Sequence, residues 1–379
     1  MDLKHWLSDR TLIVCVGSGG VGKTTTAASI ALQAALEGRN VLVLTIDPAK
    51  RLANALGLSS FGNEAHRVDI GEAKGELWAM MLDAQSTWDN LIERLAQDPE
   101  VKNRILNNRI YRYVANSLAG SQEYMATEKL HDIAKTGAYD LIVLDTPPVK
   151  NALDFLESPG RLIHFFDERI LKWFLSPYRK LRFGRRLLMG PTAVVWKLLS
   201  VIFGRDFLDE LAQFFEDFRG LYKGFVMRHD AVVALFKEPK TSFVTIFAPN
   251  ESSVDVAAFF ESEFARRGLP RGGLIANQRH RCSVAEHDAS VHLQGVLQSI
   301  DVDAESKARV TARLGMAHKR LYQRTMAETA LCAQLKAQAL SPGFFQSVPK
   351  LEGKVHDVEG LKLIAAHIFN GEPESIGKN

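Results

Sequence analysis

The sequence predicts an α/β fold: a doubly wound, mostly parallel sheet with an inserted helical subdomain. Short apolar, β-branched runs alternate with helical stretches over most of the 379 residues, which is typical of a parallel sheet covered by helices on both faces. A glycine-rich turn follows the first run, and a long stretch rich in Leu, Phe and Arg interrupts the alternation after residue 160. The expected strands are Thr11–Val16, Val41–Ile46, Leu77–Leu82, Leu141–Leu144, Phe243–Phe247, Leu274–Ala276 and Phe344–Val348.

The first strand, Thr11–Val16, leads into a glycine-rich turn and then into an Ala-rich helix over Thr25–Leu36. Residues Gly17–Thr24 match G-x-x-x-x-G-K-[ST], the phosphate-binding P-loop. Its glycines leave backbone N–H groups free to surround phosphate oxygens, and the helix points the positive end of its dipole at the anion. In such a loop Lys23 reaches the β- and γ-phosphates, and the Thr24 hydroxyl ligates Mg²⁺. The strand before the motif and the helix after it favour this interpretation over a chance match.

Polar residues follow three later strands. Asp47 comes directly after the second expected strand, Asp145 after the fourth and Asn277 after the sixth. Ligands of parallel sheets bind at the carboxyl ends of the strands, so both aspartates are expected to face the P-loop. Asp145 would then hold Mg²⁺ through water, and Asp47 would orient or deprotonate the attacking water. For Asn277 the spacing leaves two roles open, a contact with the edge of a base and the closing of a strand.

Three long stretches are predicted to be helical: Asp83–Lys135, the insert Arg161–Phe236 and Val284–Leu340. Within the insert, Ile170–Gly204 interleaves basic and aromatic residues without any Asp or Glu, and Phe207–Phe236 is amphipathic. Three interpretations stay open: a helical subdomain with a solvated basic face, a groove for an apolar segment of another protein, and contact with an anionic membrane. The nearly uncharged run Leu187–Phe203 is too short to span a bilayer.

Taken in order, the motifs G-S-G-G-V-G-K-T-T-T, T-I-D-P-A-K, L-D-T-P-P and A-N-Q resemble the arsenite-pump ATPases and the Get-type ATPases that target tail-anchored proteins. This family belongs to the P-loop NTPases of the deviant Walker A class. The resemblance implies ATP and Mg²⁺ as ligands and a dimer that opens and closes with nucleotide. It gives Asp47 the activation of water, Asp145–Pro148 the sensing of the γ-phosphate, and Asn277 and Pro349 the adenine contact. The implied phosphate loop consists of Gly19, Gly20, Val21, Gly22, Lys23, Thr24 and Thr25.

The chain departs from the family pattern at the P-loop and in its cysteines. Ser18 stands where the family carries a signature lysine that reaches the partner's nucleotide, so hydrolysis is expected to be slow unless Lys50, Arg51 or Lys150 supplies the charge. The absence of a C-x-x-C pair argues against a zinc-clasped dimer. The cysteines are Cys15, Cys282 and Cys332, too few and too scattered for a convincing thiolate site for arsenite.

Composition gives weaker information about partners and compartment. The net charge of +3 is too small to indicate a nucleic-acid partner. Sparse cysteines favour a reducing compartment, and Met1–Arg10 lacks the pattern of a signal peptide. We therefore expect a cytoplasmic protein, and peripheral contact with the inner membrane face stays open.

These observations predict an ATP hydrolase whose dimer, with itself or with a paralogue, opens and closes to handle or target a hydrophobic or membrane-protein client. The alternatives are the energising subunit of an anion exporter and a membrane-surface ATPase of the Min or Par kind. We expect residues 1–160 to form the first part of the ATPase core, with a helical segment at 84–135. Residues 161–240 would form the client- or membrane-facing helical subdomain, and residues 241–379 the second part of the core with the adenine contacts.

Overall fold

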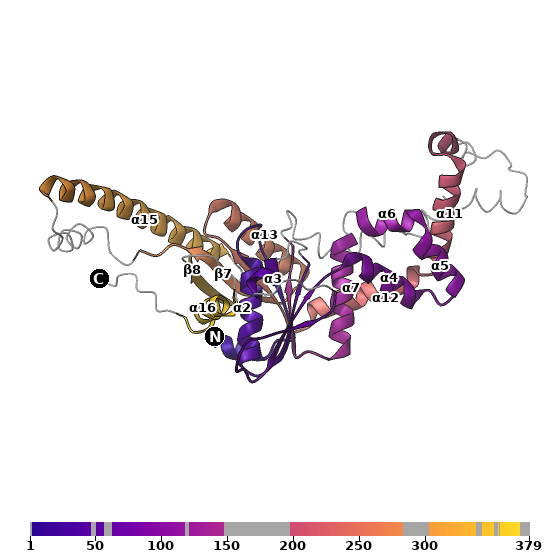
Figure 1. The fold of residues 1–379 in the computed structure, drawn as a ribbon, viewed down its shortest axis with the longest axis horizontal. Helices are drawn as coiled ribbons and strands as arrows, with labels where there is room; N and C mark the ends of the chain where they lie inside the picture. The colour runs from indigo at the N-terminus through magenta and orange to yellow at the C-terminus, as the bar shows by residue number, and fades with distance from the viewer. Residues whose placement is uncertain are drawn as a thin grey trace, which may run out of the picture.

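An eight-stranded sheet lies at the centre of the molecule (Figure 1). The computed structural model describes residues 2–46, 51–56, 63–117, 121–147, 198–282, 303–338, 343–351, 355 and 357–371. The strand order is β3-β4-β2-β5-β1-β6-β7-β8, and all neighbours are parallel except β3 and β4. The strands are β1 (Leu12–Val16), β2 (Asn40–Thr45), β3 (His66–Val68), β4 (Glu76–Met81), β5 (Leu141–Asp145), β6 (Thr241–Phe247), β7 (Arg271–Arg279) and β8 (Phe344–Pro349).

The order of the strands confirms the predicted doubly wound α/β fold. After β1 the chain moves outward through β2 and β4, returns to place β5 beside β1, and then builds β6, β7 and β8 on the other side. Strand order therefore reverses at β1, and a reversal of this kind is where open α/β sheets bind their ligands. Every strand expected from the sequence is present. The additional strand β3 was not predicted because it is short and its residues His66 and Arg67 are exposed.

Side chains alternate between the two faces of the sheet and so separate two cores. On β1, Ile13 and Cys15 pack with the helices of one face, whereas Leu12 and Val14 pack with those of the other. The first face is covered by α1 (Leu3–Ser8), α2 (Lys23–Leu36), α3 (Arg51–Ala55) and α16 (Val358–Phe369). The small alanines of α2 lie fully buried, which lets this helix sit close to the strands that carry the P-loop.

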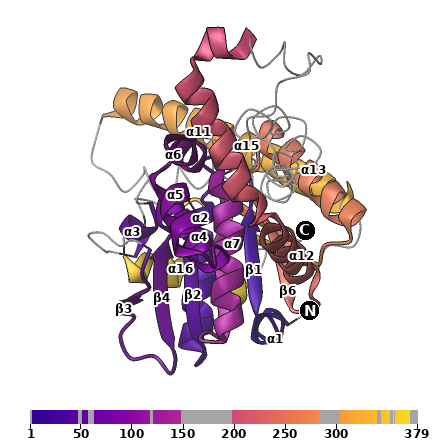
Figure 2. The same ribbon diagram turned by 90° about the vertical axis from the view of Figure 1, so that its right-hand side faces the viewer.

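A layer of helices covers the second face and extends beyond it as a helical lobe (Figures 1 and 2). An aromatic cluster holds the lobe together: Trp88, Tyr111 and Tyr124 from the first predicted helical segment meet Phe218 and Phe225 from the insert. The lobe helices are α4 (Ala84–Leu95), α5 (Pro99–Asn107), α6 (Arg109–Ser117), α7 (Ser121–Thr136), α11 (Arg205–Arg219) and α12 (Tyr222–Lys237). The described part of the insert thus shares one core with α4–α7; the predicted domain boundaries stay a prediction.

The amphipathic stretch expected over Phe207–Phe236 forms two helices, since α11 ends at Arg219, with Gly220 as its C-cap, and α12 begins at Tyr222. Glycine lowers helix propensity and commonly lies at such ends. Within the part of the chain that the structure describes, none of the helices combines the length and the hydropathy needed to cross a membrane.

Two further helices, α13 (Glu251–Arg267) and α15 (Ala304–Gln338), lie beside β6 and β7. They share a small core with the strands, formed by residues such as Phe247, Leu274 and Cys332. Only the C-terminal half of α15 joins this core, and its N-terminal half projects away from the sheet (Figure 1).

Candidate functional site

The predicted P-loop joins the end of β1 to the start of α2 through residues 17–22. Gly20 and Gly22 have φ angles of 78° and 86°, in the left-handed region that favours glycine. A Cβ on Gly17 would lie 2.0 Å from the carbonyl oxygen of Ile246 in β6, so this position also requires glycine. The loop therefore approaches the sheet closely and leads directly into the N-terminus of the 14-residue helix α2. A helix N-terminus with a turn of free N–H groups is a ready-made phosphate site.

Lys23 begins α2, and its ammonium group folds back across the loop. Its Nζ atom donates a hydrogen bond to the carbonyl oxygen of Ser18 at 2.9 Å, and the side chain is buried. Thr24 and Thr25 follow in the first turn of the helix and are half-buried. The loop brings these residues and the preceding glycines to one end of the sheet, although their contacts with nucleotide stay predictions.

Asp145 ends β5 beside β1, so it lies at the same end of the sheet as the P-loop. It is fully buried, and its Oδ2 atom accepts a hydrogen bond from the Thr45 hydroxyl at 2.9 Å. The next hydroxyl, of Thr146, donates to the carbonyl oxygen of Cys15 at 2.8 Å. Burial, and next the charge of Asp145, raise the pKa of the Cys15 thiol far above its ordinary range, and the charge of Lys23 opposes this shift. Both charges therefore act on the C-terminal end of β1.

Side chains from the opposite side of the site hold the P-loop backbone. Asn277 Nδ2 donates to the carbonyl oxygen of Val21 at 2.8 Å, and Gln278 Nε2 donates to that of Gly20 at 3.0 Å. Gln278 adopts a φ of 61°, which is uncommon for a residue with a side chain. The two amides fix two consecutive loop carbonyls, which orients the intervening peptide groups.

The sequence did not reveal the roles of Gln278 and Ser253. The Ser253 and Ser18 hydroxyl oxygens lie 3.0 Å apart, and Ser253 Oγ also accepts the N–H of Ala248 at 3.1 Å. Gln278 was within the A-N-Q motif, but its contact with Gly20 depends on the approach of two segments 258 residues apart. No local pattern signals such a contact.

Asn277 and Pro349, the two predicted adenine contacts, lie at the same end of adjacent strands. Pro349 ends β8 and is aligned with Arg279 of β7, whose carbonyl oxygen accepts the N–H of Lys350 at 2.8 Å. Asn277 is buried, and its Oδ1 atom accepts the N–H of Gln278 at 2.9 Å. A carboxamide has two donor hydrogens and two acceptor lone pairs, so these bonds leave capacity for a base edge. The adenine contact stays a prediction.

Several predicted residues lie outside the described part of the chain. They include Asp47, the predicted activator of water, together with Lys50, Pro148 and Lys150, as well as the side chain of Arg51. Their predicted roles are neither supported nor opposed by the geometry.

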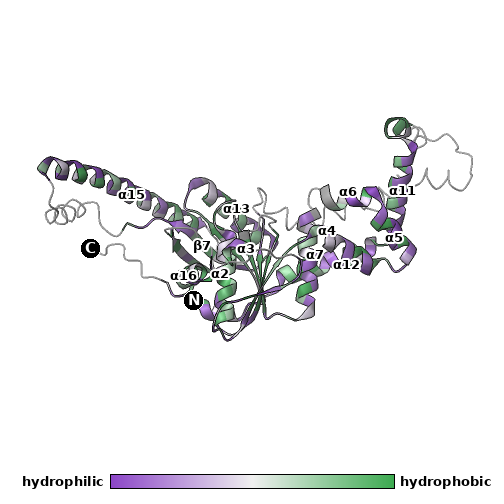
Figure 3. Ribbon diagram, in the orientation of Figure 1, coloured by the Kyte–Doolittle hydropathy of each residue, from purple (hydrophilic) through white to green (hydrophobic). Residues whose placement is uncertain are grey.

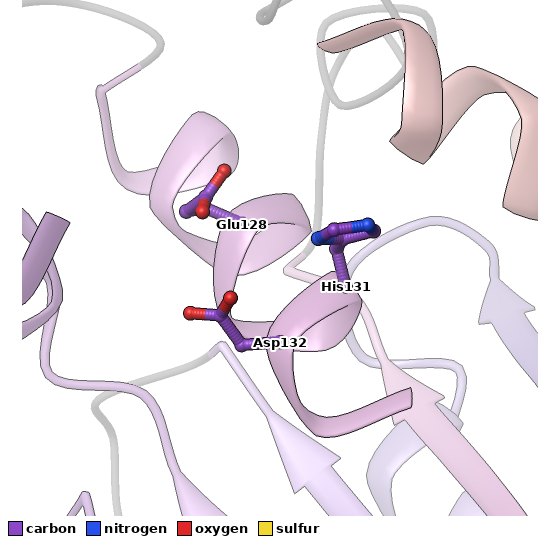
Figure 4. A group of neighbouring side chains, drawn as sticks. All are labelled: Glu128, His131 and Asp132. Carbon is purple, nitrogen blue, oxygen red and sulfur yellow. The ribbon is translucent and has the colours of Figure 1, made fainter. Parts of the chain in front are cut away.

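Helix α7 carries three side chains with oxygen and nitrogen atoms that could bind a metal: the ligand atoms of Glu128, His131 and Asp132 lie within 4.8 Å of one another (Figure 4). Both carboxylates, however, form ion pairs with arginines. Arg228 of α12 hydrogen-bonds to both Glu128 and Asp132, and Arg94 of α4 lies 2.5 Å from Asp132. Burial raises the pKa of Glu128 to about 7 although Arg228 opposes the shift. We interpret the group as an ion-pair network that joins α4, α7 and α12.

Comparison with known proteins agrees with the geometry of the site. The family model described as anion-transporting ATPase matches residues 10–290. The chain belongs to this family. It is an ATPase, and the resemblance drawn from the sequence motifs is confirmed.

Three of the similar proteins are named ATPase GET3. The chain is 29% identical to the protein of Malassezia globosa over 279 residues, which are 73% of this chain and 75% of the relative. It is 33% identical to that of Podospora anserina over 162 residues, 42% of this chain and 47% of the relative. For Aspergillus terreus the identity is 37% over 160 residues, 41% and 46% of the two chains. The last two alignments therefore span just under half of those relatives.

Proposed function

We propose that the protein hydrolyses ATP with Mg²⁺ and uses the nucleotide cycle to handle a hydrophobic protein client. The P-loop N–H groups and Lys23 would bind the β- and γ-phosphates and stabilise the charge that develops during transfer to water. Asp47 would orient or deprotonate that water. The single observation that carries the client part of the proposal is a row of exposed apolar side chains on the helical lobe.

The residues present fit Mg²⁺ by their chemistry. Mg²⁺ prefers hard oxygen ligands, and Thr24 and Asp145 offer a hydroxyl and a carboxylate at the phosphate end of the sheet. Thr45 holds the carboxylate in place through the 2.9 Å hydrogen bond. When bound, the ion would neutralise phosphate charge, with Thr24 as a direct ligand and Asp145 acting through water.

The exposed apolar residues lie directly before α11 and in its first turn, within residues 198–207. Val201 is 78% exposed, and Ile202 and Phe203 are 62% and 56% exposed. Leu198 and Phe207 extend the row at both ends. Neighbouring exposed apolar side chains of this size mark interaction sites on soluble surfaces. An amphipathic or transmembrane segment of another protein is the ligand that such a row would bind.

The nucleotide state would act through a dimer, formed with a second copy or with a paralogue. Ser18 replaces the signature lysine, and its hydroxyl lies against Ser253 of the same chain. Self-activation across the dimer is therefore expected to be weak unless another cation supplies the charge. A cytoplasmic location, with or without peripheral membrane contact, stays part of this proposal.

Transport of an anion such as arsenite is the second candidate, since the matched family is described as anion-transporting. The cysteines offer little support for a soft metalloid ligand. Cys15 is fully buried within β1, and Cys332 is buried in the core beside α13. Burial raises the pKa of Cys332 to about 11, so its thiolate is scarce at neutral pH.

The test is the ATPase rate with and without a hydrophobic helical peptide, in wild type and in a triple variant, Val201→Asp, Ile202→Asp and Phe203→Asp. We expect the peptide to stimulate the wild type and not the variant, while the basal rates agree. The matched control carries three charges at other exposed apolar positions, Met227→Asp, Phe259→Asp and Leu363→Asp. Equal loss of stimulation in the control, or full stimulation of the first variant, would reject the client surface.

A further inference from the structure

The N-terminal part of α15 contributes no buried side chain to the described core, although it approaches the segment after β7, where His318 Nε2 and Cys282 Sγ lie 3.3 Å apart. At a rise of 1.5 Å per residue, the 35 residues of α15 extend over about 50 Å. The buried residues of α15 are Thr325, Glu328, Cys332 and Leu335, all in the C-terminal half that packs beside α13 and β7. Residues 304–324 contain no buried side chain and project from the body of the protein (Figure 1). Packing in the core therefore does not explain which residues occupy positions 304–324.

This projecting half is strongly basic. Glu305 is its one acidic residue, whereas arginines and lysines recur along its whole length. Its cationic surplus exceeds the net charge of +3 of the complete chain, so the rest of the molecule is slightly acidic. The basic residues are Lys307, Arg309, Arg313, Lys319, Arg320 and Arg324.

The arginines form a row on one side of the helix. Arg309, Arg313, Arg320 and Arg324 are separated by four, seven and four residues, the spacing that places side chains on one face. All of them are exposed. Arg324 also forms an ion pair with Glu328 at 3.1 Å.

An apolar row runs beside the arginine row. Val310, Leu314 and Leu321 each follow an arginine in sequence, so they lie about 100° around the helix from it. They are 40%, 43% and 37% exposed. In Figure 3 the ribbon of this projecting part alternates between hydrophobic and hydrophilic residues. The helix therefore presents a cationic face and an adjoining narrow apolar face.

We propose that residues 304–324 of α15 dock on an anionic lipid surface. The arginines pair with headgroup phosphates, and Val310, Leu314 and Leu321 enter the interface between headgroups and acyl chains. A second copy of the helix is disfavoured because it would bring one basic row against another. Three aliphatic side chains are also few for a protein partner, since a stable protein interface buries about 800 Å² on each side. This inference does not depend on the exposed apolar residues proposed as the client surface.

The experiment measures co-sedimentation of the full chain with phosphatidylcholine vesicles, with and without phosphatidylglycerol, at low salt. We expect binding only when phosphatidylglycerol is present. The triple variant Arg309→Gln, Arg313→Gln and Arg320→Gln should bind about 100-fold more weakly, since each basic residue near an anionic surface contributes roughly a fivefold factor. Its basal ATPase rate should equal that of the wild type, which shows that the variant folds.

A control with the same loss of charge separates the helix from a general charge effect. Lys4→Gln, Lys74→Gln and Lys237→Gln remove three exposed cations elsewhere and should leave binding within a few-fold of wild type. The proposal is overturned if the control loses as much binding as the helix variant, or if the wild-type protein does not co-sediment with the anionic vesicles. Binding to RNA or to polyglutamate in place of vesicles would likewise overturn it in favour of another anionic partner.

Discussion

Replacing Gly22 by alanine tests how closely the P-loop packs against Asn277 of β7. Gly22 has a left-handed φ of 86°, and a Cβ there would lie 2.3 Å from Asn277 Nδ2. Gly20 is the matched control, because it has a similar φ of 78° and its Cβ would meet nothing within 4 Å. The difference between the two alanine variants therefore isolates the collision with Asn277.

The left-handed conformation costs an alanine about 1–2 kcal/mol at either position. At Gly22 the new methyl group must also displace the Asn277 amide, which breaks its 2.8 Å hydrogen bond to the Val21 carbonyl. A buried polar group left without its partner costs about 1–3 kcal/mol. Gly22→Ala should therefore lower the free energy of unfolding by about 2 kcal/mol more than Gly20→Ala, a factor of roughly 30 in the unfolding equilibrium.

The assay is urea denaturation of the nucleotide-free protein. In the double variant Gly22→Ala/Asn277→Gly the obstructing amide is absent. Gly22→Ala should therefore lower the free energy of unfolding less in the Asn277→Gly background than in the wild type. Equal losses for Gly20→Ala and Gly22→Ala, or strict additivity in the double variant, would refute the proposed contact between Asn277 and the loop.

Three further changes test other parts of the structure. Thr45→Val removes the hydrogen bond to Asp145 and should lower the free energy of unfolding by about 2 kcal/mol, measured in urea. Arg228→Met leaves the buried carboxylate of Glu128 without its nearest cation and should lower the free energy of unfolding by about 3–5 kcal/mol at pH 8. Ser18→Lys restores the family's lysine and should raise the steady-state ATPase rate in a form that light scattering shows to be dimeric.

Controls and pH dependence sharpen these outcomes. Burial raises the pKa of Glu128 from 4.5 to about 7, so its contribution to stability is greatest below pH 4.5 and declines as the pH rises towards 7. Loss of Arg228 should raise the pKa of Glu128 further and so extend this decline to higher pH, whereas Arg94→Met, at a more exposed pair, should have a small effect. An Arg228→Met curve parallel to wild type would contradict the ion-pair interpretation, as would an unchanged Thr45→Val midpoint for its hydrogen bond. No rate change in a dimeric Ser18→Lys variant would reject a role across the dimer.

The sequence predicted the parts of the fold that have local patterns. The five residues of β1 are all buried, so the strand appears as an uninterrupted apolar run, and the P-loop motif is contiguous. By contrast, β3 has a single buried residue and no recognisable pattern. The contacts of Gln278 with Gly20 and of Arg228 with Glu128 join segments 258 and 100 residues apart. Such pairs depend on tertiary packing, and one sequence carries no local signal for them.

Chemical modification of the buried Cys15 thiol can report how often the phosphate end of the sheet opens. The thiol lies under the P-loop, fully buried, with its pKa raised by burial and by the charge of Asp145. A thiol reagent can therefore modify it only when the C-terminal end of β1 separates from its neighbours. The rate of its modification, followed against that of the half-buried Cys282, measures how often the phosphate end of the sheet opens and by how much bound nucleotide suppresses that opening.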